Sequence, residues 1–319
     1  MKKFFAFLVL AGMLCVAVSA EAAAKQQVNI AGSSTGGTWY MLAGAMSNVL
    51  NKYQDLMEAT PIPSAGSFEN IRNMRDKRVD FGIVLPNVAA GAYKGVSPWQ
   101  ENRYEGLSGL FNIYSFPYMV IVKADSPIQS LADLKGKTIG GGPAGGTENV
   151  ILMEAILPYY GLGLSDVKLV PLTDGERASA LTDGHIDVGV WLLGVTSPTL
   201  TELTTVNDVR FIPLEKELLE KANAAYPFYT IGEIAPGTFK GQAESVSSIV
   251  MWGMMNCGDY MDEELVYQFT KTIFDHKAEV EDVVRLFKDV NFENAILGID
   301  IPIHPGARRY FEEKGVKFD

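Results

Sequence analysis

Apolar and polar residues alternate in a pattern that predicts short strands followed by helices along most of the chain. The run Val28–Ala31 has the length and composition of a strand, and the small-residue stretch Gly32–Gly37 follows it. From Thr38 onward apolar residues recur at helical spacing, at Trp39, Leu42, Ala43, Met46, Val49 and Leu50. The first unit is therefore predicted to be a strand, a glycine-rich turn and the start of a helix.

Similar units follow along the chain. Further strands are predicted at 57–62, 79–85, 107–113, 118–122, 138–139, 168–172, 188–193, 209–214 and 246–253. Helices are predicted to begin at Ser67 and Pro86 and to cover 148–160, 176–183, 199–205 and 215–221. Beyond 253 the pattern changes to long amphipathic helices, one capped by Asp262 and the last beginning at Pro305. This alternation predicts an α/β fold with doubly wound, largely parallel sheets.

Two glycine-rich turns hold equivalent positions in this pattern. The second, Gly140–Thr147, follows a strand and opens a helix, as Gly32–Gly37 does. Such a turn exposes backbone N–H groups at the positive end of a helix dipole, which suits a carboxylate or a phosphate. Ser67 is predicted to cap its helix, with Asn70 in the first turn near the same kind of dipole end.

The predicted turns lie where open α/β sheets bind ligands, at the carboxyl ends of strands. Two such units facing each other would form a cleft. A break in the pattern follows 118–122, so a hinge is predicted near Val122–Asp125 that lets the cleft close. Trp191, in the strand 188–193, is predicted either to pack in the core or to face the ligand.

Short motifs leave other interpretations open. A Walker A loop is excluded because no lysine lies between Lys25 and Lys52. The first turn satisfies G-x-S-x-G with Ser34 as nucleophile, but it follows the first strand, without the earlier strands and oxyanion loop of an α/β-hydrolase. The second matches G-x-G-x-x-G, with Asp174 after the next strand as the acidic residue of a dinucleotide site. A further alternative is that the glycines only make tight turns.

Composition narrows the class of protein. The chain has 319 residues, enough for two domains, and a net charge of −11 that argues against nucleic acid as a partner. Residues 1–24 have the charged start, apolar stretch and small-residue cleavage sites of a secretory signal, so the mature protein is predicted to be periplasmic. Cys257 is predicted to be a buried structural thiol, and the three histidines lack metal-ligand spacing, so neither a metal nor a cofactor is predicted.

Taken together, several stretches make the chain resemble the TAXI group of solute-binding proteins, the extracytoplasmic receptors of TRAP transporters. The stretches are G-S-S-T-G-G-T-W-Y (32–40), G-S-F-E-N (66–70), V-D-F-G-I-V (79–84), S-L-A-D-L-K-G-K (130–137), G-G-T-E-N (145–149), D-G-H-I-D-V-G-V-W (183–191), A-P-G-T-F-K-G-Q (235–242) and I-H-P-G-A-R-R-Y (303–310). The resemblance implies a two-lobed, type II-like periplasmic-binding-protein fold, with a small organic acid of the glutamate or 2-oxoglutarate type held between the lobes and delivered to a membrane symporter.

The resemblance also implies a set of ligand-binding residues. In the first lobe they are Ser33, Ser34, Thr35, Gly36, Gly37, Tyr40, Ser67, Asn70 and Asn87, and from the other lobe Gly145, Gly146, Thr147, Trp191 and Gly194. Leu85-Pro86-Asn87 replaces the polar Gln-Ser-Asp run expected of the family. Two alternatives follow: Asn87 and Tyr40 accommodate the far end of the ligand, or the protein prefers a different acid. The predicted limits are 25–122 for the first lobe, 123–235 for the second, and 236–319 for a return to the first.

The predicted activity is binding without catalysis, by a protein that is a monomer and whose partner is the set of TRAP membrane subunits. Two alternatives remain at this stage. One is a binding protein that signals to a membrane kinase, and the other is a secreted serine hydrolase that uses Ser34.

Overall fold

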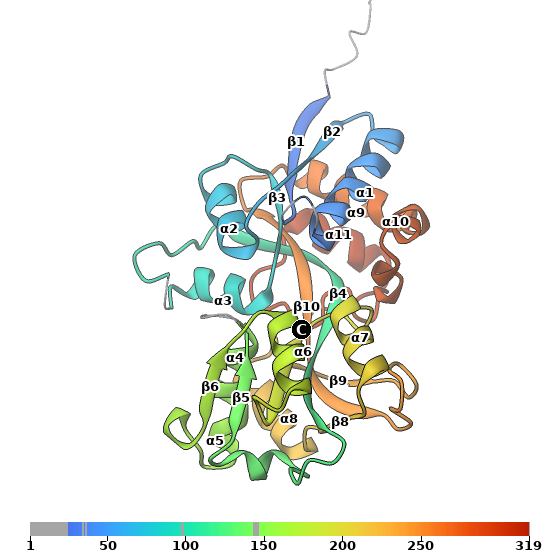
Figure 1. Ribbon diagram of the computed structural model, residues 1–319. Helices are drawn as coiled ribbons and strands as arrows, with labels where there is room; N and C mark the ends of the chain where they lie inside the picture. The colour runs from blue at the N-terminus through green and yellow to red at the C-terminus, as the bar shows by residue number, and fades with distance from the viewer. Residues whose placement is uncertain (1–24, 34, 36, 97–98, 143–146, 319) are drawn as a thin grey trace, which may run out of the picture.

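Two long strands, β4 (Leu107–Lys123) and β10 (Val246–Gly258), run through the molecule and join its two lobes (Figure 1). The computed structural model describes residues 25–33, 35, 37–96, 99–142 and 147–318. The first lobe, at the top of Figure 1, contains the N-terminal end of the described chain, and Val316 and Phe318 at the other end pack against its core. The second lobe contains the middle of the chain. The predicted α/β class is confirmed.

One sheet passes through both lobes, in the order β2-β1-β3-β10-β4-β7-β5-β6, with β8 on β4 and β9 on β10. Within each lobe the strands that alternate with helices pair in parallel, β1 with β2 and β3, and β5 with β6 and β7. The other strands are β1 (Gln26–Ala31), β2 (Met57–Ile62), β3 (Phe81–Val84), β5 (Thr138–Gly141), β6 (Lys168–Pro171), β7 (Val188–Leu192), β8 (Val209–Phe211) and β9 (Thr230–Ile234).

Helices cover both faces of the sheet in the first lobe. Consecutive strand residues face opposite sides of the sheet. Ile30 packs with α1, α9, α10 and α11, whereas Ala31 packs with α2 and α3. The helices are α1 (Thr38–Tyr53), α2 (Ser67–Arg75), α3 (Pro86–Lys94), α9 (Glu263–Asp275), α10 (Lys277–Val283) and α11 (Pro305–Glu313), and a 3₁₀ segment, η4 (Arg285–Asp289), follows α10. The predicted cap of α9 is confirmed, because Asp262 accepts a hydrogen bond from the Leu265 amide at 3.0 Å.

The second lobe repeats this arrangement. Val190 of β7 faces a core with α4 and α8, and the next residue, Trp191, faces the opposite core with α6 and α7. The helical segments are η1 (Leu131–Leu134), α4 (Thr147–Ile151), η2 (Leu152–Ile156), α5 (Leu157–Tyr159), η3 (Leu164–Asp166), α6 (Asp174–Thr182), α7 (Pro198–Val206) and α8 (Lys216–Ala225).

The predicted helix 148–160 is interrupted by a π-helical turn, η2. Pro158 follows this turn, and it has no N–H to donate to the carbonyl of Glu154. The loss of that α-helical hydrogen bond accounts for a local change of helix type, a feature frequent at functional sites.

The structure has one strand, β4, where two were predicted at 107–113 and 118–122. Pairing with β10 continues to Pro117, opposite Val250, and pairing with β7 begins at Tyr118. The proline therefore lies where the strand changes partners, and not inside a long two-sided ladder. The chain crosses between lobes at this point, before the predicted hinge at Val122–Asp125, where Val122 is still paired with β8. The lobe limits 25–122, 123–235 and 236–319 stay a prediction.

A buried histidine caps the last helix, which begins at Pro305 as predicted. The Nδ1 atom of His304 accepts a hydrogen bond from the Gly306 amide at 3.3 Å, and its Nε2 lies 3.1 Å from the carbonyl oxygen of Met261. Burial lowers the pKa of His304 below the ordinary value of 6.5. The ring is therefore held neutral, because an acceptor Nδ1 carries no proton.

We expect this cap to make stability depend on pH. Since the folded pKa lies below the unfolded one, the unfolded chain binds more protons, and stability falls as pH decreases from about 6.5 toward the lowered value. In His304→Asn the amide oxygen caps the helix without titrating. Urea unfolding at pH 5 to 7 should give a flatter pH profile for His304→Asn than for the wild type, and parallel profiles would contradict the assignment.

Candidate functional site

The first glycine turn packs tightly against the helix that it opens. A Cβ atom on Gly32 would lie 2.6 Å from the carbonyl oxygen of Trp39, so only glycine fits there. Gly37 is the N-cap of α1, and among the described residues no side chain caps this helix. Ser33 is half-buried and Thr35 is exposed, whereas the predicted ligands Ser34 and Gly36 lie outside the described residues. Gly32 is therefore required for packing, whatever the turn binds.

Asn70 anchors this turn from inside the protein. Its side chain is fully buried and its amide nitrogen donates to two carbonyl oxygens, those of Gly32 at 2.8 Å and Ile83 at 2.7 Å. It thus joins the carboxyl ends of β1 and β3. The described geometry gives the amide nitrogen of Asn70 a positioning role, and the ligand contact suggested by the sequence stays a prediction.

Loss of these two hydrogen bonds should destabilise the first lobe. We expect Asn70→Ala to lower the free energy of unfolding by about 1–3 kcal/mol, because two buried carbonyl groups lose their donor. Asn73→Ala is the matched control on the same helix, since the Asn73 side chain makes no hydrogen bond within the described chain. Denaturant unfolding measures both, and equal effects would contradict this role.

Ser67 does not cap α2, so its predicted role as the N-cap is wrong. The N-cap of α2 is Gly66, whose φ of 97° suits glycine, and Ser67 is the first helical residue. The Ser67 hydroxyl oxygen accepts a hydrogen bond from the Leu85 amide at 3.0 Å, which links α2 to the start of α3. Its hydroxyl hydrogen is left to donate elsewhere.

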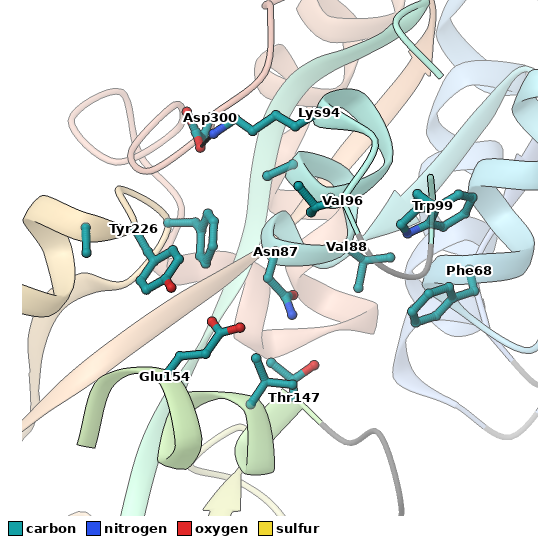
Figure 2. Close-up of a pocket in the computed structure, with 15 residues that line it drawn as sticks. Phe68, Asn87, Val88, Lys94, Val96, Trp99, Thr147, Glu154, Tyr226 and Asp300 are labelled. Atoms are coloured by element: carbon teal, nitrogen blue, oxygen red, sulfur yellow. Dashed lines mark hydrogen bonds and ion pairs between the residues drawn. The ribbon is translucent and has the colours of Figure 1, made fainter. Parts of the chain in front are cut away.

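One cavity, which we call cavity 1, lies between the lobes and has a volume of about 490 Å³. Its first-lobe wall comes from α2 and α3, with the segment that follows α3, and its second-lobe wall from α4, η2 and the end of α8. Figure 2 shows Asn87 pointing into it from α3, toward Thr147 and Glu154 on the opposite wall. Two of the predicted ligand residues, Asn87 and Thr147, are therefore brought together from different lobes.

Most of the wall of cavity 1 is apolar. Phe68 and Trp99 stack with ring centroids 5.5 Å apart, and Tyr226 lies on the far side, with its ring centroid 5.7 Å from that of Phe228. Lys94 and Asp300, also in the wall, form an ion pair with each other. The Oδ1 atom of Asn87 is buried and has no hydrogen-bond partner among the described residues. The cavity is thus an apolar enclosure with the amide side chain of Asn87 in its lining.

A second cavity, cavity 2, lies between the lobes on the other face of the sheet and has a volume of about 350 Å³. It includes the predicted residues Ser33 and Gly194, with the hydroxyl-bearing residues Thr38, Thr196 and Ser197. The described parts of the two glycine turns therefore line different cavities, Ser33 in cavity 2 and Thr147 in cavity 1. Gly145 and Gly146, which were expected to close over the ligand, lie outside the described residues.

Two further predicted residues lie apart from both cavities. Trp191 is fully buried, and its ring packs under the guanidinium of Arg177, with 5.1 Å between them, in the core covered by α6 and α7. Cavity 1 lies on the opposite face of this sheet. Of the two predicted roles of Trp191, packing in the core or facing the ligand, the structure therefore shows packing in the core. Tyr40 is half-buried on α1 and lines neither cavity 1 nor cavity 2.

Glycines of the second turn serve the close packing of the sheet. A Cβ on Gly140 would lie 2.4 Å from the Ile186 side chain, and one on Gly141 would lie 2.0 Å from the Asn149 oxygen. Asp174, the acidic residue of the dinucleotide alternative, forms an ion pair with Arg177 at 3.4 Å. These contacts give the matching positions structural roles.

The described cysteine and the three histidines lie away from both cavities. Cys257 is buried, as predicted, and burial raises the pKa of its thiol well above the ordinary value. His185, His276 and His304 line neither cavity 1 nor cavity 2. Within the described ranges, no group of three or more His, Cys, Asp or Glu side chains is placed to hold a metal ion.

Sequence reasoning missed the residues that give cavity 1 its character, namely Glu154, Tyr226 and the stacked pair Phe68 and Trp99. In the sequence, Phe68 is notable only as a member of the stretch 66–70 that resembles the TAXI group. Glu154 has an ordinary position in the predicted helix 148–160. The sequence did contain one indication of the irregular helix at Glu154: Pro158, four residues later, has no N–H to donate to the Glu154 carbonyl.

Comparison with known families now identifies the chain. The model of the NMT1-like family matches residues 30–315. The chain belongs to the NMT1-like family. The finer resemblance to the TAXI group goes beyond this match and stays a prediction.

The NMT1-like protein also shares its fold with solved periplasmic binding proteins, which confirms the predicted two-lobed, type II-like fold. The periplasmic aliphatic sulphonate binding protein SsuA from Escherichia coli is 14% identical, with a TM-score of 0.53 and coverage of 90% of this chain and 78% of that one. XAC2383 from Xanthomonas citri, solved bound to ATP, is 13% identical, with a TM-score of 0.54 and coverage of 91% and 95%. In the part of the chain that the structure describes, no helix has the length and apolar character to cross a membrane.

Proposed function

We propose that this NMT1-like protein is an extracytoplasmic solute-binding protein that captures a small organic carboxylate or an amino acid between its lobes. The observation that carries the proposal is cavity 1, whose walls come from both lobes and include Asn87 from one and Thr147 from the other. A solute that contacts both walls stabilises a closed arrangement of the lobes, because it binds that arrangement more tightly than an open one.

The continuous strands β4 and β10 connect the two lobes, and bending of these strands would let the lobes close. Both pass from one lobe to the other, and β4 changes partners between Pro117 and Tyr118. We place the hinge there, since a small rotation at this point moves the α3 wall of cavity 1 toward the α4 wall.

Known proteins of this fold support an anionic solute. The names of the two solved neighbours refer to a sulphonate and to ATP, which are both anions. The start of α2 contributes Phe68 to the lining of cavity 1, and the amide groups of a helix start favour an anion. Charge-assisted hydrogen bonds of ~1.5–3 kcal/mol each would give micromolar affinity or better after the cost of ordering.

We propose that the partner is a TRAP-type membrane transporter, to which this protein delivers its solute, and that the protein is periplasmic. The proposal rests on the resemblance of the stretches 32–40, 66–70 and 303–310 to TAXI receptors and on the secretory pattern of residues 1–24. Association with purified TRAP membrane subunits in the presence of solute would support it, and association with a membrane kinase instead would overturn it.

The solute class is tested by thermal shift and calorimetry with mono- and dicarboxylates, 2-oxo acids and amino acids. A ligand at about 100 times its Kd stabilises the folded protein by about 2.7 kcal/mol, which is a clear shift in the unfolding midpoint. We expect at least one acid of the panel to give this shift. If no acid does so at millimolar concentration, the proposed function is wrong.

A further inference from the structure

We propose that Glu154 recognises an ammonium group of the solute, so that the ligand of cavity 1 is an amino acid with an apolar side chain. This inference rests on the proposed function, because it assumes that the solute binds in cavity 1. It departs from the predicted glutamate or 2-oxoglutarate type, because the acid carries an amine and its side chain is apolar.

Three charged residues of the described chain line cavity 1, namely Lys94, Asp300 and Glu154. Lys94 and Asp300 neutralise each other in an ion pair. Glu154 has no counter-ion among the described residues, and its described polar partner is the hydroxyl of Tyr229, which donates to Oε2 at 3.4 Å. The described lining therefore has a net negative charge located at Glu154.

The position of Glu154 makes that charge available to a ligand. It lies on the π-helical turn η2, and Figure 2 shows its carboxylate directed into the cavity, with Asn87 opposite and Tyr226 beside it. Partial burial removes water from the carboxylate and raises the pKa of Glu154. A cation from the ligand offsets this desolvation, whereas a second anion there adds repulsion.

The rest of the wall fits an apolar side chain. The stacked Phe68 and Trp99, with Val88 and Val96, line one end of the cavity, and Phe228 lies near the other. A second carboxylate on the ligand would meet no unpaired cation among the described lining residues, since Lys94 is held by Asp300. Burying such a group without a partner is unfavourable. Apolar amino acids are thus favoured over glutamate.

The test uses amino acids and their counterparts without the amine. Calorimetry compares L-phenylalanine with 3-phenylpropionate, L-leucine with 4-methylpentanoate, and L-glutamate with glutarate. We expect an apolar amino acid to bind most tightly, and at least about 10-fold more tightly than its counterpart without the amine. In Glu154→Gln this ratio should fall to about one. Glu202→Gln, the same change at an exposed position of α7, should leave the ratio unchanged.

The outcomes separate this inference from the proposed function. Equal affinities within each pair, or an unchanged ratio in folded Glu154→Gln, would overturn the role of Glu154 and leave the proposed function standing. Binding of carboxylates alone would do the same. Tightest binding of L-glutamate would overturn the assignment of an apolar side chain, again with the proposed function standing. If none of these acids or the wider acid panel binds, the proposed function fails and the inference fails with it.

Discussion

Replacing Val150 with tryptophan should weaken solute binding by at least about 100-fold, which corresponds to about 2.8 kcal/mol of binding free energy. Val150 is a half-buried residue of α4 in the second-lobe wall of cavity 1. An indole at this position occupies the volume that the solute needs and prevents α4 from approaching α3. Calorimetry with the tightest-binding acid gives the loss of affinity directly.

Cavity 2 provides the matched control for this substitution. Thr196 is an exposed residue in the wall of cavity 2, so Thr196→Trp introduces the same bulk on the other face of the sheet. We expect its affinity to stay within about 3-fold of the wild type. A large loss in Thr196→Trp with normal binding by Val150→Trp would move the binding site to cavity 2, next to Ser33 and Gly194.

Gly32→Ala should be among the most destabilising single substitutions in the first lobe. The added methyl group would lie 2.6 Å from the Trp39 carbonyl oxygen and 2.7 Å from the Tyr40 Cα, and both are backbone atoms that cannot rotate away. The start of α1 must shift, and with it the Gly32 carbonyl that Asn70 holds. We expect a loss of about 3 kcal/mol or more in the free energy of unfolding, the range of strong overpacking.

The same helix offers a control with the opposite sign. Gly44 lies inside α1, and a Cβ there would meet no atom within 4 Å. Gly44→Ala should therefore stabilise the protein by about 0.5–1 kcal/mol, because alanine has the higher helix propensity. Urea unfolding measures both variants, and a neutral effect of Gly32→Ala would contradict the packing role of this turn.

The course of the chain could be predicted because it depends on local patterns. The apolar periodicity from Thr38, the capping side chain of Asp262 and the proline at 305 each act within a few residues, and each corresponds to a helix of the structure. β4 was divided in two because Pro117 usually ends a strand, whereas here a change of partner accommodates it.

The site could be predicted only in part, because side-chain direction depends on the tertiary structure. Asn87 and Thr147 follow strand ends, and both line cavity 1. The sequence placed Asn70 at the same kind of position, but its amide turns inward to two carbonyl groups. Trp191 and Val190 were equivalent as strand residues until the structure assigned their faces to different helices. The role of Glu154 depends on a π-helical turn that helical periodicity does not reveal.

A crystal structure with the tightest-binding acid of the panel tests the central claim most directly. The account predicts ligand density in cavity 1, in contact with Asn87 from the first lobe and with Thr147 or Glu154 from the second. Density in cavity 2, or on a surface formed by one lobe alone, would contradict it.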